Sequence, residues 1–343
     1  MDSRKASGGI RGGKKMKVKM SKKVIVSLII IIAVILMIID MRYNGVSLFE
    51  NLFRELETES MREQQVNFNY QNDIKNNPSS DIRVTDRKIV LNEDIKRLNM
   101  KNEMGSIKIT GEKRDDILLS FILTVYAEEK EQAELFIHEL DIINYSREET
   151  MIIELKRPEF NKGIKGIKVD YTLVVPEELL LEIKNSFGRL TVKNMIEDII
   201  LKNSFDVVDI MNISGDVELA ATYGNIFVEN ISGNLLTNSS FASAEYSRIS
   251  GSLTANTAFG QLSISDFSNS LQIRGSYSEI DIELSDELSE YSVSSETKYG
   301  SINTNLPFQV EAKDNVQTMN GSEGSGSIKI NVINEYGNIN INK

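Results

Sequence analysis

The amino-acid sequence predicts a mainly β chain: a single-stranded parallel β-solenoid (β-helix) with about 18 residues per coil, capped by a small α+β region and preceded by one transmembrane helix. Three observations predict this fold class. An unbroken apolar run lies near the N-terminus, apolar and polar residues alternate in the C-terminal half, and six aromatic residues recur at intervals of 18. These six residues are Phe187, Phe205, Tyr223, Phe241, Phe259 and Tyr277.

The composition excludes several classes of chemistry. The 343 residues include no cysteine and a single histidine, His138. Disulfides, thiolate zinc sites, iron–sulfur clusters, a cysteine nucleophile and a multi-histidine metal site are therefore excluded. His138 lies on a predicted helix with no serine or cysteine at a motif spacing, so we expect a surface side chain. No cofactor and no catalytic residue are predicted.

The charge distribution divides the chain into two parts. Residues 1–23 carry nine basic side chains and one acidic one, a net charge of +8. The whole chain has a net charge of −11, so the remainder carries −19. An acidic body repels the phosphates of nucleic acids, so nucleic-acid binding is not expected. The basic tail is expected to stay in the cytoplasm, against anionic membrane lipid.

A transmembrane signal anchor is predicted at residues 24–41. Its core, Val24 to Ile39, is sixteen residues long and apolar except for Ser27. An α-helix of that length spans about 24 Å, close to the ~30 Å of the hydrocarbon layer. A cleaved signal peptide is the main alternative, but residues 40–43 contain no small-residue cleavage site. The cations before the span predict a single-pass protein of the cell membrane with its C-terminal domain extracytoplasmic.

Residues 42–81 are predicted to form a juxtamembrane helix and a linker. Ser47 and Glu50 have the spacing of a capping box, and apolar residues follow at helical intervals from Leu48 to Leu56. Three interpretations of this apolar stripe remain open: contact with the lipid surface, pairing with a partner helix, or packing on the body of the protein.

Residues 82–180 are expected to cap the open N-terminal end of the solenoid. Alternation of apolar and polar residues predicts several strands, and one segment has helical character. A cap of this kind protects the exposed strand edge from association with other chains. The predicted strands cover residues 105–110, 117–126, 152–155 and 169–175, and the predicted helix covers residues 128–140.

The regular coils are predicted at residues 181–284. A second half-repeat, Ile-Ser-Gly, begins at Ile213, Ile231 and Ile249 with the same 18-residue period. Two short strands and two turns fit into 18 residues, and neighbouring coils stack about 4.8 Å apart. Equivalent side chains therefore form columns. We expect the aromatic and Leu/Ile columns in the interior, together with hydrogen-bonded serine columns and an asparagine column of Asn194, Asn212 and Asn230.

Residues 285–343 are predicted to form looser coils and a C-terminal cap. The motif aromatic-Gly-x-Ile recurs at Tyr299 and Tyr336, which favours further coils. Residues 321–326 are rich in glycine and serine, and we expect them to form a mobile excursion between these coils.

Three stretches resemble a known protein family. They are GSIKITG at 105–111, the segment from Val169 to Asn194 with its Val-Pro turn and first aromatic-Gly coil, and GSGSIKINVINEYGNININ from Gly324. Over residues 82–343 the chain thus resembles the bacterial putative-adhesin domain family of unknown function. The resemblance implies a membrane-anchored β-solenoid and supplies no catalytic or binding residues. The coil is more regular here than is usual in that family.

One candidate site is acidic. Glu279, Asp281 and Glu283 alternate with isoleucines, so their carboxylates share one outer face of a strand. Such a row is a candidate metal site for a hard cation such as Ca²⁺, or a surface for a basic partner. A solvated acidic face is the alternative interpretation.

The other candidate site is apolar. The alternation places Val207, Met211 and Phe227 on the outside of neighbouring coils. An exposed apolar patch is either a partner site or a contact with another part of the chain, here the N-terminal cap or the linker.

The sequence therefore favours a non-catalytic, membrane-anchored protein with adhesin-like binding or scaffolding at the cell envelope. Long repetitive faces without a reactive side-chain set favour this function, with an envelope polymer or a membrane protein as partner. An envelope-sensing regulatory partner of another membrane protein is the second hypothesis, based on the aliphatic span and the juxtamembrane stripe. A polysaccharide-active enzyme is the third, and it depends on the three carboxylates at residues 279–283 alone.

Overall fold

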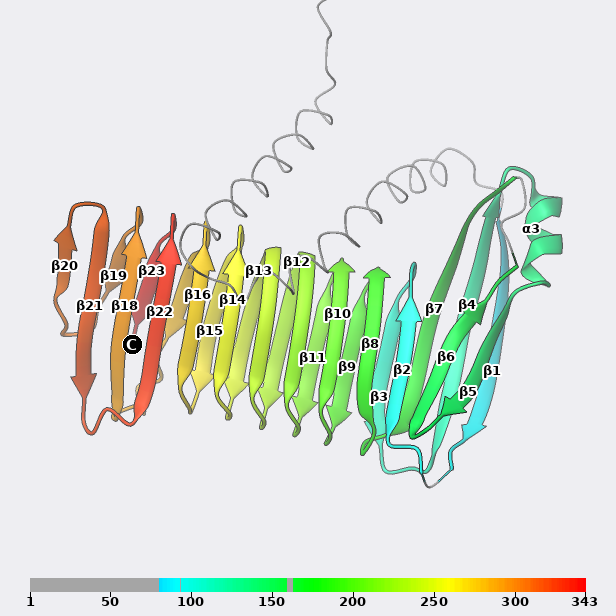
Figure 1. Ribbon diagram of the computed structural model, residues 1–343, viewed down its shortest axis with the longest axis horizontal. Helices are drawn as coiled ribbons and strands as arrows, with labels where there is room; N and C mark the ends of the chain where they lie inside the picture. Colours follow the sequence, from blue (N-terminus) through cyan, green and yellow to red (C-terminus); the bar gives the residue numbers. More distant parts are fainter. Residues whose placement is uncertain (1–79, 93, 159–162) are drawn as a thin grey trace, which may run out of the picture. The chain divides into compact units, whose positions relative to one another are not determined.

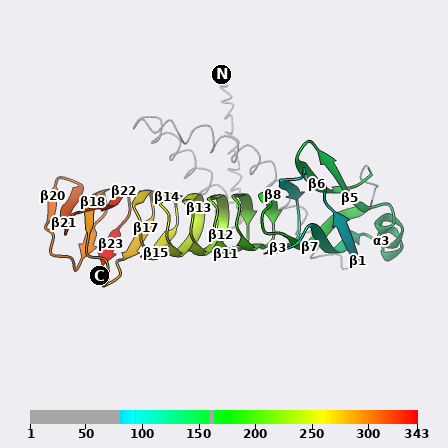
Figure 2. The same ribbon diagram turned by 90° about the horizontal axis from the view of Figure 1, so that it is seen from below.

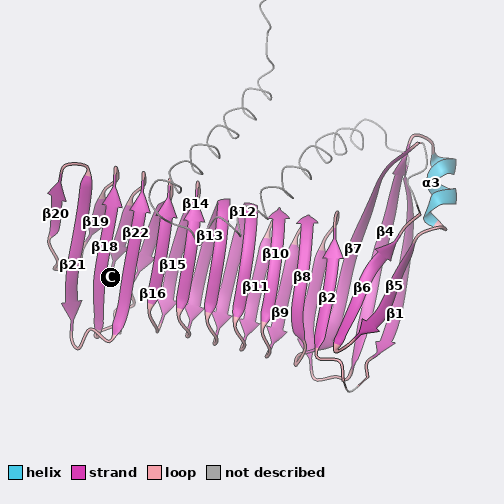
Figure 3. Ribbon diagram, in the orientation of Figure 1, coloured by secondary structure: helices cyan, strands magenta, loops and turns pink. Residues whose placement is uncertain are grey.

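The structure is a computed structural model that describes residues 80–92, 94–158 and 163–343. These residues form 23 strands and one helix, α3 (Lys130–Ile137), which confirms a mainly β fold (Figure 3). The predicted tail, membrane segment and juxtamembrane helix lie outside the described residues. Within the three described ranges, no helix has the length and apolar character needed to cross a membrane.

The middle of the described chain is a stack of six coils of 18 residues (Figure 1). Parallel pairing joins each residue to the one 18 positions later: Leu181 pairs with Ile199, and Ile199 pairs with Val217. The strands of these coils are β8 (Leu180–Phe187), β9 (Leu190–Met195), β10 (Ile199–Phe205), β11 (Val208–Ile213), β12 (Val217–Ile231), β13 (Leu235–Ile249), β14 (Leu253–Ala258), β15 (Gln261–Phe267), β16 (Leu271–Ser276) and β17 (Glu279–Glu283).

The coils form two faces around a shared interior. The first face contains β8, β10, β14 and β16, together with the N-terminal halves of β12 and β13. The second face contains β9, β11, β15 and β17, together with the C-terminal halves of β12 and β13. The same succession of strands along the stack is visible in Figure 2.

Alternation along each strand separates the interior from the surface. In β8 the side chains of Leu181 and Ile183 are buried, while Glu182 between them is exposed. The equivalent interior positions of most later coils hold Leu, Ile or Val side chains that are 1% exposed or less. Each such side chain stabilises the fold by about 2 kcal/mol through burial. The Leu/Ile columns predicted from the sequence are therefore interior.

The chain passes between the two faces at two corners, and both use left-handed backbone conformations. We call the first the aromatic corner, because it contains the aromatic residue of each coil; φ is +57° at Tyr223, for example. We call the second the asparagine corner, where φ is +59° at Asn194, Asn212 and Asn230. Asparagine adopts this conformation more readily than other residues with a side chain.

A column of glycines at the asparagine corner results from close approach of successive coils. A Cβ atom on Gly233 would lie 2.3 Å from the carbonyl oxygen of Gly215, and one on Gly251 would lie 2.1 Å from that of Gly233. No side chain fits at such distances, which explains why the repeat has glycine at this position.

The N-terminal strands join the coils out of sequence order. Strand β2 (Arg97–Asn102) pairs in parallel with β8 on one side and with β6 (Thr150–Lys156) on the other. In the same way, β3 (Ile107–Glu112) lies between β9 and β7 (Ile164–Pro176). Residues 97–112 therefore form one more coil, next to the first regular one.

Antiparallel pairs complete the N-terminal end. Strand β4 (Asp116–Ala127) pairs antiparallel with β7 and with β1 (Ser80–Val90), and β5 (Asp141–Arg147) pairs antiparallel with β6. Helix α3 packs against β1 and β4. The sheet is thus mixed: it is parallel along the coils and antiparallel at this end, where the sequence predicted a small α+β cap. Two residues suffice to join β5 to β6 as a hairpin, whereas a parallel pair needs a long crossover.

The C-terminal strands are also out of sequence order. Strand β22 (Ile328–Glu335) lies between β16 and β18 (Tyr291–Lys298), and β23 (Ile339–Asn342) lies between β17 and β19 (Ile302–Thr304). The last coil of the chain is therefore inserted between two earlier ones, where the sequence predicted looser coils that end in a cap.

An antiparallel hairpin closes the C-terminal end. Strand β21 (Val316–Glu323) pairs with β18 and with β20 (Val310–Lys313). The predicted mobile excursion at residues 321–326 is therefore wrong in part. Residues 321–323 belong to β21, and Gly324 and Gly326 form the turn that follows, with φ of +60° and +66°.

Candidate functional site

The aromatic residues of the repeat form a continuous stack of eight rings. Neighbouring ring centroids are 4.5–5.0 Å apart, and neighbouring ring planes differ by 2–13°. Because the last coil is inserted, Tyr336 follows Tyr277 in the stack and Tyr299 follows Tyr336. We call this stack the aromatic ladder: Phe187, Phe205, Tyr223, Phe241, Phe259, Tyr277, Tyr336 and Tyr299.

The aromatic ladder lies at the surface, which corrects the prediction of an interior column. Phe187, Phe205 and Phe241 are half-buried, whereas Tyr336 is 39% exposed and Tyr299 is 49% exposed. Each corner contains a residue with positive φ, which is the ring residue itself in six coils and the following Gly188 or Asp206 in the first two. The ring is thereby turned out of the interior, and the inward side of the alternation changes from odd to even residue numbers there. The aromatic-Gly pair, an element of a turn, was the sequence signal for this position.

Amide and carboxylate side chains form a second ladder at the asparagine corner. Asn212 Nδ2 donates to Asn194 Oδ1 at 3.0 Å, and Asn230 Nδ2 donates to Asn212 Oδ1 at 2.8 Å. These bonds confirm the predicted hydrogen bonding up the asparagine column. A parallel set joins backbone to side chain: the Asp216 N–H donates to Asp198 Oδ1 at 2.8 Å, for example. The amides are thus engaged with one another, as a structural column requires.

The three carboxylates of β17 lie on its outer side. Glu279 and Glu283 are exposed, and Asp281 between them is half-buried. Asp281 accepts hydrogen bonds from Asn340 Nδ2 at 2.6 Å and from Gln261 Nε2 at 3.3 Å. Among the described residues, no three His, Cys, Asp or Glu side chains are placed to hold a metal ion. The row is therefore an acidic surface in which, within the described chain, only the middle carboxylate is held by amides.

The predicted apolar patch is on the second face. Phe227 is 42% exposed, while Val207 and Met211 on the preceding coil are half-buried. In its own column Phe227 lies between Asp209 and Glu245. An aromatic ring between two carboxylates is a small apolar group within a polar surface. The N-terminal strands meet the coils at β8 and β9, one coil before this patch begins.

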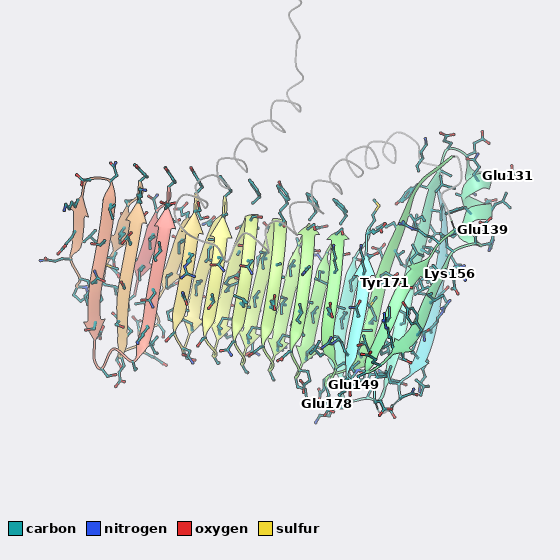
Figure 4. All side chains as sticks on the ribbon, in the orientation of Figure 1. Glu131, Glu139, Glu149, Lys156, Tyr171 and Glu178 are labelled. Carbon is teal, nitrogen blue, oxygen red and sulfur yellow. The ribbon has the colours of Figure 1, made fainter. Side chains whose placement is uncertain are left out.

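One open depression of about 530 Å³ at the N-terminal end is lined by charges of both signs. Glu149 and Glu178, which line it, lie together at one end of the cap in Figure 4. Lys96 Nζ lies 2.8 Å from Glu149 Oε1, and this hydrogen bond raises the pKa of Lys96. The described lining contains no histidine. His138 is exposed at the C-terminal end of α3, remote in sequence from every residue of the coils.

Fold and surface together define a class of protein: a stack of β-coils whose side-chain ladders lie at the surface. The chain belongs to the Toastrack DUF4097 family, whose model matches residues 66–342. This membership confirms the resemblance to an adhesin-like domain of unknown function. No curated protein matches the chain in sequence.

Three solved structures are similar to this chain. A "putative cell adhesion protein" from Clostridium sporogenes is 15% identical, with a TM-score of 0.27, and covers 76% of this chain and 99% of its own. A "putative adhesin" from Bacteroides fragilis is 11% identical, with a TM-score of 0.38 and coverage of 76% and 97%. A "putative lipid binding protein" from Parabacteroides distasonis is 14% identical, with a TM-score of 0.39 and coverage of 77% and 97%. Structural similarity at these TM-scores does not support an argument about function.

Proposed function

We propose that this protein is a membrane-anchored extracytoplasmic module with adhesin-like binding or scaffolding at the cell envelope and without catalytic activity. The observation that carries the proposal is the aromatic ladder, a continuous surface feature shared by eight coils. A ladder of this kind provides contact area along a line, and its repetition suits an extended partner.

The 18-residue coils serve this function as a single-stranded parallel solenoid over residues 181–284. Their interior columns and their hydrogen-bonded asparagine column hold the outward side chains at a fixed spacing. A surface with a constant repeat is suited to a polymeric envelope partner or to a membrane protein with an elongated contact.

The anchor of this module is the apolar segment at residues 24–41, which follows a basic tail of net charge +8. This arrangement places the coils outside the cytoplasm, next to the membrane. The absence of cysteine is compatible with such a location, because no thiol is available for oxidation.

Binding is tested on cells that carry the full chain. Purified envelope polymers are presented at micromolar concentration, and cells that carry residues 1–79 alone are the control. We expect retention by the full chain only. A full chain that retains no polymer, and that cross-links to no neighbouring membrane protein, overturns the binding function.

Catalysis is tested with the same full chain on a panel of polyuronates and related acidic polysaccharides. We expect no turnover, because Asp281, the middle carboxylate of the β17 row, is engaged by two amides. Turnover that is abolished by Glu279→Gln or Glu283→Gln contradicts the proposal and identifies a polysaccharide-active enzyme.

A further inference from the structure

The outermost strand of the N-terminal cap, β1, has one long open edge. Among the described residues β1 pairs only with β4, so no strand lies along the other edge of its eleven residues. It is the last strand of its face, at the opposite end of the stack from β19 (Figure 1). The other three terminal strands are shorter: β5 has seven residues, β20 has four and β19 has three. A long open edge can pair with a strand of another chain.

Exposed apolar side chains are concentrated on the outer side of β1. Val90 is 75% exposed, Val84 is 63% exposed and Ile82 is 59% exposed. On the neighbouring strand β4, Leu118 and Ile122 are each 41% exposed, and Ile122 lies directly opposite Val84. Large apolar side chains that gather on one exposed face mark an interaction site.

The inner side of β1 is already engaged by the cap itself. Arg83 donates to the backbone oxygen of Leu140 at 2.8 Å, and Arg87 forms an ion pair with Asp141. Helix α3 also packs against β1. The arginine contacts hold the strand in place from the inner side, so a second chain would meet β1 at its edge and on its outer side.

The charges on β1 select one register for pairing with a second copy of the chain. Two copies related by a two-fold axis pair antiparallel, and the central residue determines which side chains lie opposite each other. With Arg87 at the centre, Asp86 of each copy lies opposite Lys88 of the other. In the same register Val84 of each copy lies opposite Val90 of the other, a favourable pair of β-branched side chains. A centre at Asp86 or at Lys88 instead places like charges opposite each other, which is destabilising.

The remaining charges are compatible with this register. Arg87 lies opposite its own copy, but each of the two guanidinium groups is neutralised by its ion pair with Asp141. Lys88 Nζ lies 2.6 Å from Asp116 Oδ2, and its side chain is still 64% exposed, so it can meet Asp86 of the second copy as well. Asp86 is exposed, and no ion pair engages it within the described chain.

We propose that β1 is a homodimerisation strand. Two copies of the chain pair antiparallel through residues 84–90, centred on Arg87, and join their second faces into one continuous sheet. The dimer buries the edge of β1 in both copies and brings the exposed valines of one copy against those of the other. It depends neither on an envelope partner nor on the membrane anchor, so it goes beyond the proposed function.

The first test measures the mass of the full chain in detergent by sedimentation equilibrium, where we expect a dimer at micromolar concentration. Asp86→Lys places lysines opposite each other, and Lys88→Asp places aspartates opposite each other. Each variant alone should raise the dissociation constant about tenfold or more. An equal mixture of the two variants should recover the dimer, because every contact between them joins opposite charges. Glu245→Lys, an equal change of charge at an exposed residue of the coils, is the control and should leave the dimer unchanged.

The second test uses single cysteines to measure the register, since the chain has no cysteine of its own. Residues 84 and 90 of different copies lie opposite each other in the proposed register, within the distance that a disulfide requires. The two residues 84 of one dimer are six positions apart along the strand, about 20 Å. A mixture of Val84→Cys and Val90→Cys chains should therefore form disulfide-linked dimers several-fold faster than either variant alone.

The outcomes separate this dimer from the proposed function. A chain that is monomeric at micromolar concentration overturns the dimer. A dimer that persists unchanged in Asp86→Lys also overturns it, because the contact then lies outside β1. Cross-linking of Val84→Cys alone as fast as in the mixture overturns the register. A dimeric chain that retains no envelope polymer contradicts the binding function and leaves the homodimerisation strand intact.

Discussion

A tyrosine inside the fourth coil interrupts a column of aliphatic residues. Tyr246 pairs with Val228 and Ile264 in register and is fully buried. Its volume is compensated within the same coil, where Ala244 occupies a position that is Ile226 in the preceding one. The hydroxyl groups of Tyr246 and Thr237 are both buried and interact with each other, but neither has a partner in hydrogen-bond geometry among the described residues. Packing volume, not hydrogen bonding, therefore explains this tyrosine.

Substitutions at Tyr246 test this compensation. Tyr246→Val leaves a cavity and is expected to lower the free energy of unfolding by about 3 kcal/mol. Adding Ala244→Ile restores the regular column and should recover most of that loss. Tyr246→Phe removes only the unpartnered hydroxyl, so its effect should remain within about 1 kcal/mol. Chemical denaturation measures all three, and a double variant no more stable than Tyr246→Val contradicts the argument.

Buried tyrosines make the free energy of unfolding depend on pH in the alkaline range. Burial raises the pKa of Tyr246 and of Tyr291 to about 12 and raises the pKa of Tyr171 as well. Tyrosine in an unfolded chain titrates near 10. Because the pKa values are higher in the folded chain, the three neutral tyrosines make their full contribution to the free energy of unfolding below about pH 10. This contribution decreases as the pH rises from 10 towards 12. In that pH range each tyrosine lowers the free energy of unfolding by about 1.4 kcal/mol per pH unit.

Denaturation midpoints measured from pH 8 to pH 12 check this dependence. The Tyr246→Phe variant should show a shallower decline, because one of the three groups no longer titrates. A stability that stays constant up to about pH 12 would show that these hydroxyls ionise as freely in the folded chain as in the unfolded one.

At the scale of elements, the corners determine how the strands stack. The glycine column allows each coil to approach the previous one, and the asparagine column supplies both the left-handed backbone and a side-chain hydrogen bond. A strand with good alternation but without these corner residues would not return in register. The corners thus explain why the period is constant over six coils.

Gly233→Ala tests the close approach at the asparagine corner. The new Cβ would lie 2.3 Å from the Gly215 carbonyl oxygen, so backbone must shift in two coils. We expect a loss of about 1–3 kcal/mol in the free energy of unfolding, as for overpacked positions. Ser250→Ala, an exposed change near the same corner, is the control and should have little effect. Equal stability of both variants would contradict the close approach.

Outside the 18-residue repeat, the elements of the N-terminal part were predicted only in part. The predicted strands near residues 107–112, 116–127, 150–156 and 164–176 are present, and α3 lies within the predicted helix. Strands β1, β2 and β5 were missed. In β1, Arg83 and Arg87 occupy positions on the inner side and donate to backbone oxygens near α3, which disguises the alternation. The sequence predicted that the aromatic residues form a column, but it placed that column in the interior, whereas the structure has it at the surface.

At the scale of the whole described chain, both ends of the stack contain an inserted coil. Residues 97–112 lie between the first regular coil and β6–β7, and residues 328–342 lie between β16–β17 and β18–β19. Each inserted coil has a partner on both sides. The ends of the stack are then closed by antiparallel strands, which limits edge-to-edge association.

Removal of residues 328–343 tests the inserted C-terminal coil. The interior would lose four fully buried side chains, each contributing about 2 kcal/mol, and two strand edges would open in the middle of the stack. The four side chains are Ile330, Val332, Ile339 and Ile341. We expect loss of cooperative unfolding in calorimetry and aggregation in solution. The control is Lys329→Ala with Asn331→Ala, two exposed changes on β22. A truncated chain that remains soluble with an unchanged Tm would contradict the insertion.

The sequence by itself determined the 18-residue period, the stacking of equivalent side chains and the alternation that separates interior from surface, because these are local patterns repeated along the chain. Tertiary structure decided the order of the terminal coils and the antiparallel ends. Both depend on free energy gained between segments far apart in sequence, here residues 271–283 and 328–342, which no local pattern encodes. Tertiary structure also decided that the aromatic ladder is at the surface, because the backbone conformation at the corner, and not the apolar character of the ring, sets where the side chain points.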